Sequence, residues 1–193
     1  ISYEKDDHKG RRMGIFETQD IFKIKHRRSP FIEVSPSLDI PKKDLPIDPY
    51  ILGIWLGDGH KNSSTITVGE KDIEHFERYG IKKEVRKGIF SVRVPKLITE
   101  LKKIGLYKNK HIPIDYILSS IEQRMELLRG LMDTDGYCDV HGNCEFAQND
   151  NQLAKDVYLL LRSLGFKARA KKYDSYLNGR NVGKKIRIGF NPD

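Results

Sequence analysis

Two aspartates, Asp58 and Asp135, stand at matching points of two similar segments, and their position is typical of metal-binding acids. Residues 50–60 read YILGIWLGDGH and residues 127–137 read LLRGLMDTDGY, so each acid ends an apolar helical pattern and precedes a glycine. The C-terminal end of a helix carries partial negative charge, which disfavours a carboxylate by about 0.3–1 kcal/mol. A divalent cation such as Mg²⁺ would relieve this repulsion, because it binds carboxylate and carbonyl oxygens. The alternative is that both helices are ordinary core elements and both acids are ordinary turn residues.

Small residues predict that the two helices pack closely against each other. Gly53 and Gly57 lie four positions apart and share one helix face, as do Gly130 and Thr134. Contact along these faces would bring the two acids side by side, where bound cations could serve one phosphate in each strand of a duplex. We expect Trp55 to be a core residue beside this interface.

The segments that follow the two acids match in order and predict two α/β modules of one design. Helical and strand-like periodicities follow each other in the same sequence twice. The expected strand, helix and two basic strands are 63–69, 70–79, 81–87 and 89–95 in the first module, and 144–148, 151–164, 166–172 and 184–190 in the second. We therefore predict an α+β fold with halves at 46–119 and 120–193.

Local signals place the ends of the two acid-bearing helices. Asp48 precedes Pro49, which is a capping carboxylate followed by a proline suited to the first helical position. Ser120 and Gln123 fit a capping box at the start of the second helix. Both helices are expected to stop at a glycine, as helices often do. Asp133 should point to another side of its helix than Asp135 and have a structural role.

Alternation along the strands predicts one apolar face and one cationic face. Ile66 and Val68 alternate with threonines, and Ala168 and Ala170 alternate with basic residues. A broad cationic sheet face fits a DNA groove, although an ordinary solvated face would have the same pattern. The candidate DNA contacts are Lys61, Thr65, Thr67, Arg86, Lys87, Arg93, His141, Glu145, Gln148, Lys167, Arg169, Lys171, Lys185 and Arg187.

The composition favours a polyanionic partner without identifying one. There are 35 Lys and Arg against 27 Asp and Glu, a formal charge of +8, and such an excess displaces counterions from nucleic acid. No apolar run reaches membrane-spanning length and no signal peptide is visible, so we expect a cytoplasmic protein without a membrane partner. Cys138 and Cys144 predict no disulfide framework. With His141 they supply only three of the four ligands of a structural zinc site, so we interpret them as two thiols in a loop.

At this point the motifs resemble a known family. ILGIWLGDG (51–59) and LRGLMDTDG (128–136) resemble the two motifs of the LAGLIDADG homing endonucleases. LPIDPYILGIWLGDG (45–59) is similar to inteins, including those in replicative helicases. NKHIP (109–113), followed by EQRMELLRGLMDTDG, is similar to the pattern of intein endonucleases between their motifs. The resemblance covers about residues 41–190.

The resemblance implies two pseudo-symmetric αββαββα-like halves, packed through the motif helices, whose antiparallel sheets form a DNA-binding saddle. It implies a site-specific endonuclease that hydrolyses both strands of duplex DNA at a long recognition site with Mg²⁺ or Mn²⁺. By position, Asp58 and Asp135 would bind metal with help from the carbonyls of Gly57 and Thr134. Lys110 would polarise water or stabilise the transition state, unless it is a plain surface lysine. The family also implies a monomer, within a larger intein precursor.

Two departures from the family pattern leave alternatives open. A helix and a lysine are expected after the last strands of the second half, as counterparts of 95–106 and Lys110, and that half looks incomplete. Position 1 is Ile rather than Cys or Ser, so we expect no self-splicing. Residues 1–45, with a basic run at 23–28, are predicted to be an irregular linker or the remnant of an adjoining splicing domain. A DNA- or intron-RNA-binding module without cleavage is the second hypothesis, and a purely structural insert is the third.

Overall fold

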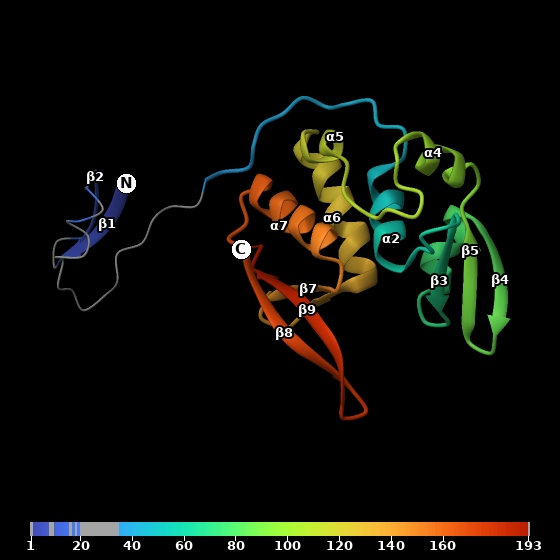
Figure 1. Ribbon diagram of the computed structural model, residues 1–193. Coiled ribbons are helices and arrows are strands. Elements are labelled where there is room, and N and C mark those ends of the chain that lie inside the picture. The colour runs from blue at the N-terminus through green and yellow to red at the C-terminus, as the bar shows by residue number, and fades with distance from the viewer. Residues whose placement is uncertain (1, 8–9, 16, 18, 20–34, 193) are drawn as a thin grey trace. The chain divides into compact units, whose positions relative to one another are not determined.

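The computed structural model describes residues 2–7, 10–15, 17, 19 and 35–192 (Figure 1). The chain divides into two compact units, Ile1–Pro36 and Ser37–Asp193. In the first unit, β1 (Ser2–Asp7) and β2 (Gly10–Ile15) form an antiparallel hairpin, in a region where we expected either an irregular linker or the remnant of an adjoining splicing domain. Their sequences, SYEKDD and GRRMGI, contain few apolar residues, which is why periodicity did not indicate strands. The basic run at 23–28 lies outside the described residues.

The first half of the second unit contains one acid-bearing helix and a three-stranded antiparallel sheet. Its strands lie in the order β3-β5-β4. The elements are α2 (Pro49–Asp58), β3 (Thr65–Gly69), α3 (Ile73–Phe76), the 3-10 helix η1 (Glu77–Tyr79), β4 (Ile81–Arg86), β5 (Ile89–Arg93), α4 (Leu97–Lys103) and α5 (Ile114–Ile117).

The second half repeats this plan with a four-stranded antiparallel sheet in the order β6-β7-β9-β8. Its elements are α6 (Ile121–Asp135), β6 (Gly136–Cys138), β7 (Cys144–Gln148), α7 (Asn151–Ser163), β8 (Arg169–Leu177) and β9 (Arg180–Phe190). In the first half, the single antiparallel bridge Gly59↔Ile66 stands where β6 pairs with β7. The predicted α+β class is confirmed.

The starts of both acid-bearing helices follow the predicted signals. The Asp48 carboxylate accepts a hydrogen bond from the Ile51 backbone N–H at 3.1 Å, and Pro49 is the first helical residue. The Ser120 hydroxyl accepts from the Gln123 backbone N–H, and the Gln123 side chain accepts from the Ser120 N–H. Both capping predictions are confirmed.

Both helices stop at the predicted glycines, but for a different reason than we expected. Gly59 has φ −72° and Gly136 has φ −93°, so neither adopts the left-handed conformation that usually selects glycine at a helix end. A Cβ on Gly59 would lie 2.7 Å from Cγ of Trp55, and one on Gly136 would lie 2.5 Å from Cα of Met132. Close packing on the preceding turn therefore requires glycine at both positions.

The predicted alternation holds where a sheet is covered by helices and fails at its edge. Ile66, Val68 and Ala168 are buried as expected. Ala170 pairs with buried Ile188 and so lies on the apolar face, yet it is exposed because β8 is an edge strand.

Three predicted lengths were wrong. The helix expected from residue 70 begins at Ile73, after a turn in which the Asp72 backbone N–H bonds to the carbonyl of Gly69. Strands β8 and β9 are longer than predicted and meet at a two-residue turn of Asn178 and Gly179, both with positive φ. Asn-Gly is the favoured sequence for this kind of hairpin turn, and the polar residues around it hid the strands from the periodicity.

The prediction of two thiols was also wrong. Cys138 and Cys144 form a disulfide, since they are direct cross-strand partners in the β6–β7 hairpin with a Cα–Cα distance of 4.1 Å. His141 lies in the exposed loop between them, where Asp139 accepts hydrogen bonds from the backbone N–H groups of His141 and Asn143.

A buried arginine attaches residues 37–38 to the helices of the second half. The Arg124 guanidinium is fully buried and donates to the carbonyls of Ser119, Ser163 and Leu38. The Leu38 backbone N–H bonds in return to the Ser163 carbonyl at 2.9 Å. One side chain thus joins three separate segments of the chain.

Candidate functional site

Helices α2 and α6 touch through their backbones, as the small residues predict. A Cβ on Gly53 would lie 2.9 Å from Cα of Gly130, and one on Gly130 would lie 3.0 Å from Cα of Gly53. Real Cβ contacts this short are essentially not tolerated, so no side chain fits at the crossing point. Trp55 is fully buried beside this contact, which confirms it as a core residue, and its indole N–H donates to the carbonyl of Ser63 at 3.0 Å.

One turn further on, the contact continues between Gly57 and Thr134. A Cβ on Gly57 would lie 2.7 Å from Cβ of Thr134 and would collide with its hydroxyl. That hydroxyl donates back to the carbonyls of Gly130 and Leu131 at 3.1 and 3.0 Å, so it is turned into its own helix. The next residue on each helix is an acid, so the two motif helices end together.

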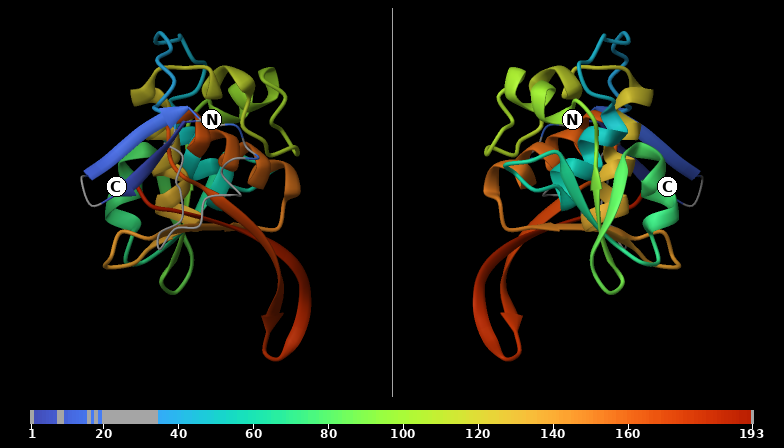
Figure 2. Two further views of the ribbon diagram at one scale, coloured as in Figure 1. Left: turned by 90° about the vertical axis from the view of Figure 1, so that its left-hand side faces the viewer. Right: turned by 90° about the vertical axis from the view of Figure 1, so that its right-hand side faces the viewer.

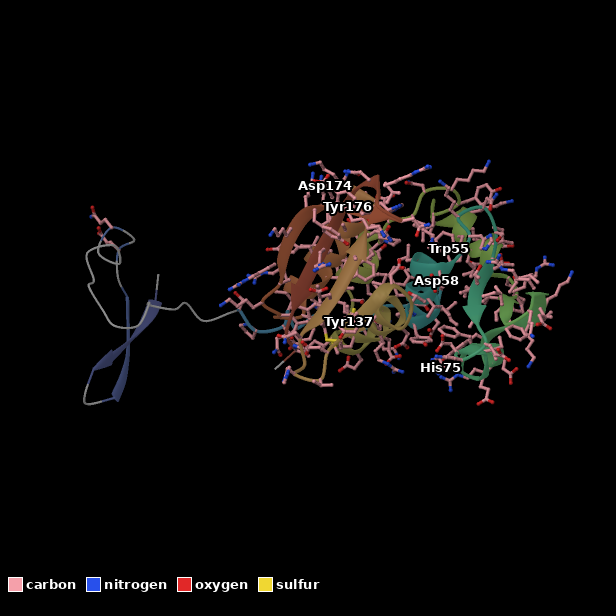
Figure 3. The ribbon with its side chains drawn as sticks, turned by 90° about the horizontal axis from the view of Figure 1, so that it is seen from below. Trp55, Asp58, His75, Tyr137, Asp174 and Tyr176 are labelled. Carbon is pink, nitrogen blue, oxygen red and sulfur yellow. A yellow bond between two sulfur atoms is a disulfide. The ribbon has the colours of Figure 1, made fainter. Side chains whose placement is uncertain are left out.

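Both acids have raised pKa values. Although Asp58 keeps contact with solvent, partial burial raises the pKa of its carboxyl, and the neighbouring Asp135 carboxylate raises it further. Burial likewise raises the pKa of Asp135. A pair of partly desolvated acids at two negative helix ends attracts a cation. Figure 3 shows Asp58 between the two sheets.

The Lys110 ammonium lies at this negative centre. Its Nζ donates to the carbonyls of Leu56 and Gly57, both at 2.9 Å, and lies 5.3 Å from the ring of Trp55. Burial lowers the pKa of Lys110 to about 8, against the opposing effect of Asp135 and Asp58. Lys110 is therefore not a plain surface lysine, and the Gly57 carbonyl, predicted to bind metal, accepts from its ammonium.

Gln148, a predicted DNA contact, lies beside the second acid. Its amide Nε2 donates to the Asp135 carboxylate at 3.2 Å. Its carbonyl accepts from the backbone N–H of Asn149 at 2.8 Å, which fixes the direction of the amide. In the ladder Gln148 pairs with Ile186, on the helix-covered face of the sheet. Strand alternation could have revealed this orientation of Gln148. Side chains two residues apart in a strand lie on the same face, and Gln148 comes two residues after buried Phe146.

In the first sheet, the predicted contacts lie on the face away from the helices. Thr65 and Arg93 are direct partners in the ladder, and Arg93 is exposed. Thr67 hydrogen bonds through its hydroxyl to Nε2 of His60 at 2.9 Å. His60 was not predicted, although it directly follows the first motif. Together these residues form a polar surface next to Asp58.

In the second sheet, the uncovered face carries paired charges. The Arg187 guanidinium lies 3.4 Å from the Glu145 carboxylate and 4.8 Å from the centre of the Tyr173 ring. Lys185 is the ladder partner of Tyr173 on this same face. Its positive charge lowers the pKa of Asp135 and so opposes part of the increase that burial causes. The exposed Tyr137, two residues after Asp135, is the ladder partner of Glu145 on this face and was not predicted.

The remaining predicted contacts are all exposed, on strands or in connections. Arg86 and Lys87 lie at the tip of the β4–β5 hairpin, and Arg169 and Lys171 lie on edge strand β8. The others are in connections, namely Lys61, Lys167 and His141.

Asp133 has the structural role that was expected. Its carboxylate accepts a hydrogen bond from the Tyr50 hydroxyl at 2.9 Å, and Nε2 of His75 lies 3.8 Å away. Burial and this hydrogen bond raise the pKa of Tyr50. The cluster joins the two halves on a side of α6 away from Asp135.

Side chains alone do not form a complete metal site in the part of the chain that the structure describes, where no group of three or more His, Cys, Asp or Glu could hold an ion. Two acids with helix-end carbonyls nevertheless offer only oxygen ligands, which suits Mg²⁺ or Mn²⁺ completed by water and phosphate oxygens. Two carbonyls at the end of α2, those of Leu56 and Gly57, already accept hydrogen bonds from the Lys110 ammonium. The residues therefore fit a hard divalent cation.

Comparison with known proteins finds a related family. Residues 122–189, which include Asp135 and Gln148, match the family model of the LAGLIDADG-like domain. The match supports the LAGLIDADG family. The α+β fold, with helices and two antiparallel sheets in residues 37–192, is consistent with the fold of LAGLIDADG proteins.

A curated relative gives a second comparison. The chain is 37% identical over 150 residues to the replicative DNA helicase DnaB of Mycobacterium intracellulare. That alignment spans 78% of this chain and 24% of the helicase, so the chain corresponds to a minor part of its relative. Within the described residues, no helix is long and apolar enough to cross a membrane.

Proposed function

We propose that this chain is a site-specific endonuclease that hydrolyses both strands of duplex DNA. The observation that carries the proposal is the joint ending of α2 and α6, which presents two acids and one partly buried lysine between two sheets. The match to a LAGLIDADG-like domain supports the same function. The similarity to a helicase much longer than this chain supports a setting in a larger precursor, as an intein.

The chain's own residues would divide the reaction between them. Asp58 and Asp135 would hold Mg²⁺ or Mn²⁺, with the carbonyls of Gly57 and Thr134 as further candidates. When bound, the cation neutralises negative charge on the phosphate undergoing hydrolysis. Lys110 would keep its positive charge beside that phosphate, and Gln148 would orient the Asp135 carboxylate. Exposed Thr, Arg and Lys side chains of both sheets would fix the duplex in register.

The test uses a plasmid that carries the helicase coding sequence without the inserted segment. With Mg²⁺, the protein should cut both strands at one position, while EDTA, Asp58→Asn and Asp135→Asn should abolish cutting. Lys42→Ala, an exposed lysine outside the site, is the matched control and should cut normally. Equal cutting by the Asn variants, or no cutting by the unchanged protein, would refute the proposal.

One observation favours a second candidate, a DNA- or intron-RNA-binding module without cleavage. Among the described residues, no three metal-binding side chains meet at the site. In that case, duplex DNA or intron RNA would bind equally to the unchanged protein and to the Asp58→Asn variant, and neither protein would nick a supercoiled plasmid.

A further inference from the structure

We propose that the β8–β9 hairpin is a DNA-reading arm that makes the contacted DNA longer on the flank served by the second half than on the flank served by the first. The inference rests on the proposed function, because it assumes that duplex DNA lies across the two sheets. It adds an asymmetry that the internal repeat does not predict.

The arm is the part of the hairpin beyond β7. Strand β7 pairs with β9 only from Ile186 to Phe190, so residues 173–185 form a ribbon of two strands bonded to each other alone. In the first half, β3 pairs with the whole of β5, from Ile89 to Arg93, and leaves no such extension. The two halves therefore present sheets of unequal length.

The arm projects toward the side of the molecule on which Asp58 is seen. Figures 1 and 2 show both hairpins pointing the same way, with β8–β9 reaching further than β4–β5. Figure 3 views the molecule from that side. A register shift between Ser175 and Tyr176, together with Gly183 at φ 107°, marks a bulge, and bulges bend and twist a ribbon. The curvature suits a path along a DNA groove.

The base of the arm is held on the uncovered face of the sheet. Arg187 lies over the Tyr173 ring and faces the Glu145 carboxylate. Beyond this point, the described side chains make an ion pair between Lys184 and Asp174 at 3.8 Å, and the Asn181 side chain accepts from the Gly183 backbone N–H. The arm is anchored at one end and free to contact a ligand at the other.

The free part of the arm has the chemistry of a groove reader. It carries Arg180, Lys184 and Lys185 against one acid, Asp174. Tyr176 and Val182 are 65% and 56% exposed, which is high for residues of this kind. The major groove admits a two-stranded β-ribbon, where cations bind phosphates and guanine edges, and apolar groups contact thymine methyls.

The length of the arm sets the size of the asymmetry. Residues Tyr173 to Leu177 span about 17 Å at roughly 3.3 Å per residue. Duplex DNA rises about 3.4 Å per base pair. The arm should therefore extend contacts by up to about five base pairs on its own flank.

The experiment is selection of binding sites from a duplex library with a randomised region, using the full chain in Ca²⁺ so that DNA is bound without depending on cleavage. We expect a motif whose informative positions extend further from the centre on one flank. In an arm-shortened variant, residues 174–184 are replaced by Asn-Gly. It should lose these outer positions, bind the selected site at least about tenfold more weakly, and keep the rest of the motif.

Two point variants form a matched pair, because each removes an arginine that flanks a two-residue hairpin turn. Arg180→Ser, next to the Asn178–Gly179 turn, should relax only the outermost positions of the longer flank. Arg86→Ser, next to the Lys87–Gly88 turn, should relax positions on the shorter flank. Both keep the backbone intact, so they remain informative if the shortened variant does not fold.

The outcomes separate the two proposals. Enrichment of a motif that extends equally on both sides, or that is unchanged in Arg180→Ser and in the shortened variant, overturns the arm and leaves DNA binding standing. Failure to enrich any sequence, with retention that does not fall as salt rises, overturns both.

Discussion

Substitution of Gly57 by alanine tests the helix contact on which the site depends. The added Cβ would lie 2.7 Å from Cβ of Thr134 and would collide with its hydroxyl. Ordinary carbon contacts are about 3.5–4.0 Å, so the helices would have to separate by about 1 Å or Thr134 would have to turn. Turning would break the hydrogen bonds of the Thr134 hydroxyl to the carbonyls of Gly130 and Leu131.

The expected loss of stability follows from two opposing contributions. Inserting a methyl group into a well-packed contact costs typically about 1–3 kcal/mol. Alanine favours a helix over glycine by up to about 1 kcal/mol, and by less here, because Gly57 is one residue from the helix end. The Gly57→Ala protein should therefore unfold about 1–2 kcal/mol more easily. Because the acids follow this contact directly, Mg²⁺-dependent cutting should fall by more than the loss of folded protein alone would cause.

The assay is urea unfolding followed by circular dichroism, in the absence of metal. Thr134→Gly removes the colliding side chain, so the double variant Gly57→Ala, Thr134→Gly should recover about 1–2 kcal/mol relative to the sum of the single changes. Gly53→Ala should be worse than Gly57→Ala and should not be rescued by Thr134→Gly, because its Cβ meets backbone atoms of α6. Gly189→Ala, with nothing within 4 Å, is the control and should be close to neutral. Additive effects of Gly57→Ala and Thr134→Gly would refute the close approach of the helices.

Three further outcomes follow from the charged groups. Because the pKa values of Asp58 and Asp135 are raised in the folded protein, the metal-free protein loses stability as pH rises through these pKa values. At pH 7, Asp58→Asn and Asp135→Asn should each be about 0.3–1 kcal/mol more stable than the unchanged protein, and neither should show the rise in Tm that Mg²⁺ gives the unchanged protein. An unchanged rise in Tm would contradict the role of these acids in metal binding. If Lys110 acts as an ammonium, cleavage should fall as pH passes about 8, and Lys110→Met should be slow with no such fall in its pH profile. Arg124→Met leaves three carbonyls without their hydrogen-bond donor. In urea titrations, the free energy of unfolding should fall by about 2–4 kcal/mol. A loss below about 1 kcal/mol would show that the carbonyls find other partners.

The sequence predicted what depends on local signals and on repetition. Asp48 and Ser120 cap their helices as expected because capping involves residues only three positions apart. Gly53 and Gly130 predicted the helix contact because a glycine on the same face of two repeated helices has a plain steric meaning. The α+β class followed from the same periodicities.

What the sequence did not reveal concerns partners that are distant in sequence or paired across strands. Cys138 and Cys144 became a disulfide through the register of a hairpin whose first strand is only three residues long. Gln148 faces Asp135 because of strand alternation and because its side-chain carbonyl accepts from the backbone N–H of Asn149 in the following turn. Arg124 binds carbonyls from three segments, and no pattern in a single segment could indicate that.

The contact that builds the site also limits how it can change. Any side chain larger than a hydrogen atom at Gly53 or Gly130 would move both helix ends, and with them both acids. The acids in turn make the metal-free protein less stable, since their charges are partly buried next to each other at negative helix ends. Lys110 offsets part of that repulsion by bonding to the end of α2. A cation bound between Asp58 and Asp135 would therefore stabilise the fold and complete the site through the same contacts, so stability and cleavage should depend on metal concentration together.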